Sequence, residues 1–201
     1  TVSTPDHNHG LAAIRAMKMG KHCFCQKPLV QTVHEARLVR QLANEKNLAT
    51  QMGNQGSAAP GLRRAVEVIQ AGVIGNPLEL HVWSNRPHWP QGVPRPEGAD
   101  EVPESLNWDA WLGPAPKHPY EPLRSHFSFR WFWDYSGGTF IDFWCHIVDV
   151  AVWALDLKGP SSVDALGGRY FVRDPTETPD NVEAVLQYPD MLLTFSYRPT
   201  P

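Results

Sequence analysis

Three polar side chains interrupt the strongly apolar stretch of residues 140–155. Asp142, His146 and Asp149 are spaced four and three residues apart, so in a helix they share one narrow stripe. Burying two carboxylates and an imidazole costs free energy unless these groups are paired or have a functional role. One interpretation is structural, with Asp142 near the helix amino terminus and His146 a hydrogen-bonded core histidine. The other is a general acid–base pair, in which a carboxylate sets the tautomer of His146.

Lys27 is a second candidate for chemistry. A lone lysine is usually a solvated surface residue. Lys27, however, follows a predicted short strand and precedes Pro28, which restricts it to extended conformations and so holds its direction. A cation fixed in this way could stabilise a developing alkoxide or help to move its proton.

His7 and His9 form a His-Asn-His sequence that could suggest a metal site. They lie at a predicted junction between a loop and a helix, and no third ligand is near them in sequence. Because catalytic zinc needs three convergent protein ligands, we expect no metal here.

Residues 83–133 are rich in Pro and Trp, which predicts a long, ordered loop system of the kind that often builds sites. Aromatic faces interleaved with polar side chains resemble a sugar-binding wall, although the same Trp residues could belong to a core or an interface. The residues concerned are Trp83, Asn85, Arg86, Trp89, Arg130, Trp131 and Trp133.

The elements that must position these residues change in character near residue 53. Before it, short strands and helices alternate, which predicts βαβ units and a parallel sheet. The expected strands are 22–26 and 48–52, and the expected helices are 7–19 and 32–46, the second opened by a Thr32–Glu35 capping box. In such sheets ligands gather at the carboxyl ends of strands. Thr4-Pro5, Gln26-Lys27-Pro28 and Gly53-Asn54-Gln55 all lie at these ends.

After residue 53, a run of strands follows one long helix that is apolar nearly all round and hence predicted to be buried. This pattern predicts a second domain with an open, mainly antiparallel sheet. The expected helices are 60–71 and 139–157, and the expected strands are 78–83, 163–172, 182–188 and 192–197.

The composition argues against two classes of binding partner, nucleic acids and membranes. The net charge of −3, with both signs interspersed, leaves no polycationic footprint for nucleic acid or an anionic membrane. No apolar run reaches the length of a membrane span. The three cysteines cannot all pair, and we expect reduced thiols.

Together these residues resemble the Gfo/Idh/MocA family of oxidoreductases, which includes glucose–fructose oxidoreductase and inositol dehydrogenase. The matching motifs are Thr4-Pro5 with His9, Gln26-Lys27-Pro28, and Asp142-x-x-x-His146 with Asp149. The resemblance implies an α/β fold, with residues 1–52 forming the C-terminal part of a Rossmann dinucleotide-binding domain. Residues 53–201 would form a substrate and oligomerisation domain of α+β type, incomplete at its carboxyl end.

The resemblance also implies NAD or NADP as cofactor, a sugar or polyol as substrate and a homo-oligomer. Lys27, Asp142 and His146 would be catalytic. The cofactor would contact Thr4, Pro5, His9, Gln26, Lys27 and Pro28. The substrate would contact Gln55, Arg86, Trp89, Arg130 and Asp149.

Two departures from the family pattern matter. Gln26 replaces the usual Glu, and the glycine-rich Gly-x-Gly-x-x-Gly turn that would hold the pyrophosphate is absent. We therefore expect a fragment that lacks the front of its cofactor domain. Localisation stays open between the cytoplasm and, if an export signal precedes Thr1, the periplasm. Two other functions also stay open: a glycoside hydrolase that uses transient sugar oxidation by NAD, and a non-catalytic sugar sensor.

Overall fold

A computed structural model describes residues 1–84 and 100–198. Two of the predicted substrate-binding residues, Arg86 and Trp89, lie outside these ranges. Contacts divide the described chain into two compact units. The first unit contains residues 1–53 and 100–138, and the second contains residues 54–84 and 139–198.

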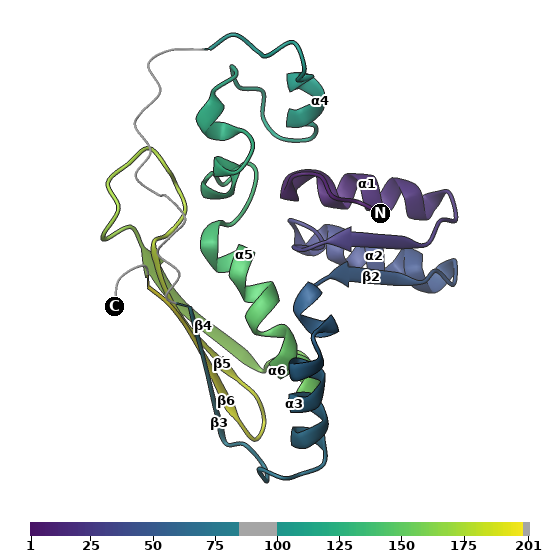
Figure 1. The fold of residues 1–201 in the computed structure, drawn as a ribbon, viewed down its shortest axis with the longest axis vertical. Helices are drawn as coiled ribbons and strands as arrows, with labels where there is room; N and C mark the ends of the chain where they lie inside the picture. The colour runs from purple at the N-terminus through teal and green to yellow at the C-terminus, as the bar shows by residue number, and fades with distance from the viewer. Residues whose placement is uncertain (85–99, 199–201) are drawn as a thin grey trace. The chain divides into compact units, whose positions relative to one another are not determined.

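The first unit begins with alternating helices and strands (Figure 1): α1 (Asp6–Lys18), β1 (Cys23–Gln26), α2 (Val33–Glu45) and β2 (Thr50–Gly53). Strands β1 and β2 pair in parallel, from Cys23 opposite Thr50 to Gln26 opposite Gly53. Val2 forms a further parallel bridge to Cys25 on the other side of β1. The predicted parallel βαβ arrangement is therefore confirmed.

Local sequence signals set these elements. The Thr32 hydroxyl accepts a hydrogen bond from the Glu35 amide, and the Glu35 carboxylate accepts one from the Thr32 amide, which starts α2 with the predicted capping box. After α1, Gly20 adopts a φ of 74°, a conformation that favours glycine and ends helices. Alternate residues of β1 face one side, so Cys23 and Cys25 are both buried in the core between the strands and helices, and both are free thiols.

Residues 100–138 contribute short helices to the first unit: α4 (Trp108–Leu112), η2 (Pro122–Arg124) and η3 (Ser128–Trp131). An aromatic cluster joins this segment to α1. The ring of Trp111 lies 5.1 Å from His7 and 5.0 Å from Tyr135, and it stacks on Trp108 at 4.7 Å. The contacts of residues 100–138 group them with residues 1–53. The division into a cofactor domain and a substrate domain near residue 53 stays a prediction.

The second unit contains a four-stranded sheet of order β3-β6-β5-β4. Its strands are β3 (Glu79–Ser84), β4 (Ser162–Gly168), β5 (Asn181–Gln187) and β6 (Leu192–Tyr197). Pairs β4–β5 and β5–β6 are antiparallel and pair β3–β6 is parallel, as expected for an open, mainly antiparallel sheet.

Helices of the second unit are η1 (Gln55–Ala58), α3 (Pro60–Gln70), α5 (Gly138–Ile147) and α6 (Asp149–Ala154). Helix α5 runs along one face of the sheet (Figure 1), where Phe140 and Trp144 both lie 5.1 Å from the ring of Phe195. Phe195 is fully buried and belongs to a core that includes Leu193 and Val148. This core fixes the helix that carries Asp142 and His146.

Two predicted elements differ in the structure. The single helix expected over 139–157 is two helices separated at Val148, and most of its side chains, including His146, are half-buried rather than buried. The strand expected over 163–172 ends at Gly168. The chain then turns because the Asp180 carboxylate accepts three backbone N–H bonds, from Tyr170, Phe171 and Val172. Neither interruption is visible in local periodicity. Within the described ranges, no helix is both long and apolar enough to cross a membrane.

Candidate functional site

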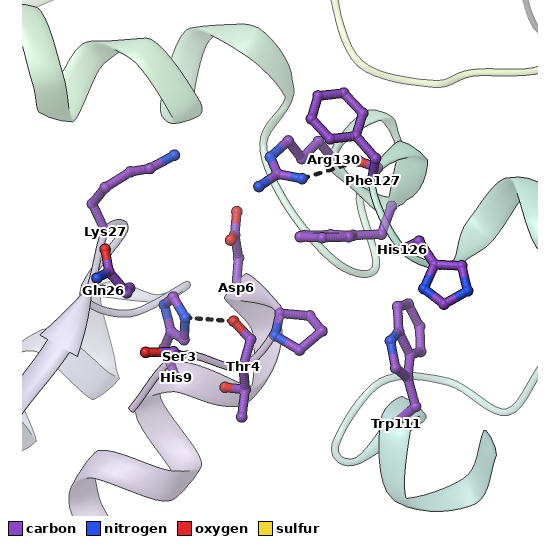
Figure 2. A pocket seen from close by; sticks show the side chains of 12 residues that line it. Ser3, Thr4, Asp6, His9, Gln26, Lys27, Trp111, His126, Phe127 and Arg130 are labelled. Atoms are coloured by element: carbon purple, nitrogen blue, oxygen red, sulfur yellow. Dashed lines mark hydrogen bonds between the residues drawn. The ribbon is translucent and has the colours of Figure 1, made fainter. Parts of the chain in front are cut away.

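A pocket of about 490 Å³ lies in the first unit at the carboxyl ends of its parallel strands (Figure 2). Six of the residues predicted from sequence to form a site line it: Thr4, Pro5, His9, Gln26, Lys27 and Arg130. The pocket is also lined by Asp6 and by aromatic side chains from residues 111–129.

The strand ends explain why these residues meet. The amide of Gln26 donates to the carbonyl of Val2 at 3.0 Å, so the loop that begins at Thr4 lies beside the end of β1. Gly53 ends β2 directly opposite Gln26. A Cβ at Gly53 would lie only 2.8 Å from the Gln26 side-chain oxygen, so glycine leaves the space that this amide needs. Lys27 follows at once, and Figure 2 shows its side chain extending toward the open pocket.

His9 braces two loops of the pocket. Its Nδ1 lies 2.7 Å from the carbonyl oxygen of Pro28, and its Nε2 lies 2.7 Å from that of Thr4. Both partners are backbone carbonyl oxygens, which accept hydrogen bonds. The side chain is 1% exposed. His9 therefore ties the Thr4 loop to the Lys27-Pro28 loop.

Asp6 is a pocket residue that sequence reasoning missed. Its side chain is 4% exposed, and the Ser136 hydroxyl donates to its carboxylate at 2.5 Å. Asp6 lies in the first turn of α1, where the helix dipole favours a negative charge. The available signal was an acidic residue directly after Thr4-Pro5. Its hydrogen-bond donor Ser136 is 130 residues away in the chain.

Arg130 comes from η3 and is held by aromatic rings. Its guanidinium carbon lies 4.7 Å from the ring centroids of both Phe127 and Phe129. One guanidinium nitrogen donates to the Phe127 carbonyl at 3.1 Å, a contact that Figure 2 marks. These contacts fix the plane of the guanidinium at the pocket wall.

His7 packs in the aromatic cluster, against the rings of Trp111 and Tyr135. Its Nε2 lies 2.9 Å from the Trp111 carbonyl, to which the Asn8 amide also donates. Burial lowers the pKa of His7 below its usual value, so the neutral ring is favoured there. His7 and His9 are thus both engaged by carbonyl oxygens. Among the residues that the structure describes, no group of three or more His, Cys, Asp or Glu side chains could hold a metal ion.

The other predicted site residues lie in the second unit. Asp142 is buried and His146 is half-buried, one turn apart on α5. Asp149 begins α6 and accepts a short hydrogen bond from Ser57 of η1. Gln55 is exposed at the start of η1. The convergence of Asp142 and His146 with Lys27 stays a prediction.

Of the described Trp residues in the expected aromatic wall, Trp131 is 1% exposed and belongs to a core. Trp83 and Trp133 are 69% and 53% exposed. The alternative of a core role is therefore correct for Trp131.

Comparison with known proteins assigns the chain to a family. Residues 1–54 match the model described as oxidoreductase family, NAD-binding Rossmann fold. Residues 61–169, more than half of the chain, match the model of the C-terminal alpha/beta domain of the same Gfo/Idh/MocA family. The chain belongs to the Gfo/Idh/MocA oxidoreductase family.

Several proteins with curated functions are similar to the chain. Levoglucosan dehydrogenase of Pseudarthrobacter phenanthrenivorans is 32% identical over 94 residues, which are 44% of this chain and 24% of that protein. The NAD-dependent scyllo-inositol 2-dehydrogenase of Bacillus subtilis is 27% identical over 154 residues, 77% of this chain and 34% of that protein. The chain thus spans about a quarter to a third of the length of these relatives.

Solved structures show the same fold. A levoglucosan dehydrogenase in complex with NADH and levoglucosan superposes with a TM-score of 0.71, at 20% identity, over 100% of this chain and 47% of that one. The WlbA dehydrogenase from Bordetella pertussis, in complex with NADH and UDP-GlcNAcA, gives a TM-score of 0.68 at 18% identity, over 99% and 50%. The Rossmann-type fold and the open second sheet are those expected of the Gfo/Idh/MocA family.

Proposed function

We propose that the protein to which this chain belongs is an NAD(P)-dependent oxidoreductase that acts on a sugar, a polyol or a sugar derivative. The observation that carries the proposal is the placement of Lys27 in a pocket at the carboxyl ends of parallel strands, beside Thr4, Pro5 and Gln26. Strand ends of this kind are where dinucleotide-binding sheets place the reactive end of a cofactor. Membership of an NAD-binding oxidoreductase family supports the same assignment.

The pocket residues fit the nicotinamide end of such a cofactor. Gly53 leaves room for the Gln26 amide at the strand edge, and His9 holds the loops of Thr4 and Pro28 together. Bound NAD(P) would supply a hydride acceptor at C4 of its nicotinamide ring. Thr4, Pro5 and Gln26 would then contact the cofactor directly, and His9 would position the loops that do so.

The reaction would oxidise a C–H(OH) centre to a carbonyl, with loss of one hydride and one proton. The Lys27 ammonium would stabilise the alkoxide that develops on the substrate oxygen. His146 would accept the hydroxyl proton, and Asp142, one turn earlier on α5, would orient the His146 ring. In reduction the proton would travel the other way. Lys27 lies in the first unit, and Asp142 and His146 lie in the second.

Substrate contacts are proposed for Arg130 in the pocket and for Gln55, Arg86, Trp89 and Asp149. We also propose that residues 1–52 are part of the cofactor domain, that residues 53–201 belong to the substrate domain, and that the full-length protein is a homo-oligomer.

The test uses the full-length protein with NAD⁺ or NADP⁺ and a panel of sugars and polyols, followed by NADH or NADPH absorbance. Lys27→Met keeps most of the side-chain volume and removes the cation. We expect kcat to fall by about a hundredfold or more, the scale of losing one preorganised electrostatic group, while cofactor affinity changes little. Lys21→Met is the matched control, since Lys21 is exposed before β1. A loss below threefold in Lys27→Met on the best substrate would remove Lys27 from the mechanism.

A further inference from the structure

His126 lines the pocket, and neither packing nor backbone conformation explains why a histidine occupies this position. Its side chain is exposed and forms no hydrogen bond, ion pair or ring contact with any residue that the structure describes. Its φ is 51°, in the left-handed region that favours glycine and that other residues rarely adopt. Figure 2 shows His126 on the wall that also carries Trp111 and Phe127, across the pocket from Gln26.

Two other non-glycine residues in the described part of the chain have a positive φ, and both have an ordinary structural reason. Asn47 and Asp156, with φ of 50° and 49°, follow the ends of α2 and α6. A left-handed residue commonly ends an α-helix, and Asn and Asp adopt this conformation more readily than most residues. Neither residue lines the pocket. His126 instead connects two short 3₁₀ turns, η2 and η3.

The turn that carries His126 is fixed on both sides. The amide and the hydroxyl of the buried Ser125 both donate to the Pro122 carbonyl, at 3.2 and 3.1 Å. Phe129, three residues after His126, is also buried. A side chain held in the left-handed region by its surroundings costs free energy, and such residues cluster at ligand-binding sites. The turn therefore sets the direction of the imidazole, and its ring nitrogens are left for a ligand.

We propose that His126 binds a hydroxyl group of a ligand in this pocket, either on the ribose next to the nicotinamide or on the sugar substrate. This inference rests on the proposed oxidoreductase function and adds a contact residue to it. An imidazole nitrogen either donates or accepts, and a hydroxyl does both, so a hydroxyl can pair with either ring nitrogen. Trp111 and Phe129 line the same pocket and offer apolar faces to ring C–H groups.

The experiment uses the full-length protein and separates the two sources of the hydroxyl. Cofactor binding is measured as the dissociation constant of NADH by fluorescence titration. Sugar binding is measured as the KM of D-glucose, D-galactose or D-xylose, whichever is oxidised with the highest kcat/KM. We expect His126→Ala to weaken one of the two by about three- to tenfold, the scale of one neutral hydrogen bond, with little change in kcat.

Deoxy sugars identify the hydroxyl if the sugar carries it. Each monodeoxy form of the best sugar is compared in wild-type protein and in His126→Ala. Removing the contacted hydroxyl should raise KM in the wild-type protein by the same factor as His126→Ala does. The same removal should have little further effect in His126→Ala, because the two changes delete one interaction.

A second variant separates binding from stability. His126→Gly removes the ring and also the backbone constraint, so it should lose the same affinity as His126→Ala while its melting temperature stays equal or rises. Asn47→Gly makes a similar backbone change outside the pocket and should leave NADH affinity and KM unchanged. If neither His126 variant folds, as judged by circular dichroism, His126→Asn carries the comparison, since Asn suits the left-handed region.

Weaker NADH binding would assign the hydroxyl to the ribose, and a raised KM with unchanged NADH affinity would assign it to the sugar. Wild-type values of both in His126→Ala would overturn the inference. A melting temperature lowered equally in His126→Ala and His126→Gly, without loss of affinity, would also overturn it, because the ring would then support the fold.

The oxidoreductase proposal can fail separately. If none of the three sugars is oxidised, that proposal fails for this panel. NADH titration, and calorimetry of the three sugars with the protein–NADH complex, then decide the role of His126. No difference between wild-type protein and His126→Ala in either measurement would refute it.

Discussion

His9 offers the sharpest test of how the pocket is held together, because its two hydrogen bonds join two separate loops. We expect His9→Ala to remove both 2.7 Å bonds, to the carbonyls of Thr4 and Pro28, at a side chain that is 1% exposed. Each bond contributes about 0.5–1.5 kcal/mol net, and a carbonyl left buried without a partner adds to the loss. The free energy of unfolding should therefore fall by about 2–4 kcal/mol.

The assay is urea denaturation of the full-length protein followed by Trp fluorescence, with the midpoint and slope both reported. His34→Ala removes the same side chain from an exposed position on α2 and should change stability by less than about 0.5 kcal/mol. The amide of Asn in His9→Asn can still donate to one carbonyl. The free energy of unfolding of this variant should therefore lie between those of His9→Ala and His34→Ala. Because His9 fixes the loops of Thr4 and Pro28, NADH affinity should also weaken in His9→Ala.

Two results would refute this reasoning. If His9→Ala were as stable as His34→Ala, the two hydrogen bonds of His9 would not stabilise the fold by joining the loops. If stability fell but NADH affinity did not change, the hydrogen bonds of His9 would stabilise the fold without shaping the cofactor pocket.

Two further predictions concern the second unit. His146→Asn should lower turnover by about 10²- to 10⁴-fold, the cost of losing a general base, with little change in melting temperature; a destabilised but active variant would instead assign His146 to the core. Asp180→Ala should cost about 2–4 kcal/mol, because three backbone N–H groups of residues 170–172 lose their acceptor. The exposed Asp190→Ala is its control in chemical denaturation, and equal stability of the two variants would contradict the role given to Asp180.

Local signals in the sequence determined much of the first unit. A capping box requires only Thr32 and Glu35 three residues apart, and a glycine after α1 can end the helix without help from distant residues. The alternation of short strands and helices was sufficient to predict a parallel sheet. The predicted sheet also predicted that Lys27 lies at a strand end, since the carboxyl ends of parallel strands lie at one edge.

The sequence also determined the family, and for a different reason. Thr4-Pro5, Gln26-Lys27-Pro28 and Asp142-x-x-x-His146 are short motifs whose order along the chain carries the information. Their recognition needed no knowledge of which residues touch.

Tertiary structure alone decided how the pocket is completed. Asp6 is a buried pocket carboxylate that accepts a hydrogen bond from Ser136, 130 residues away in the chain. Residues 100–138, which carry Arg130, have contacts that group them with residues 1–53. The break at Val148 likewise accompanies the packing of that residue into the sheet core. Contacts between residues more than a hundred positions apart leave no periodic trace in any local window, and they determine which charges the pocket contains and where its walls lie.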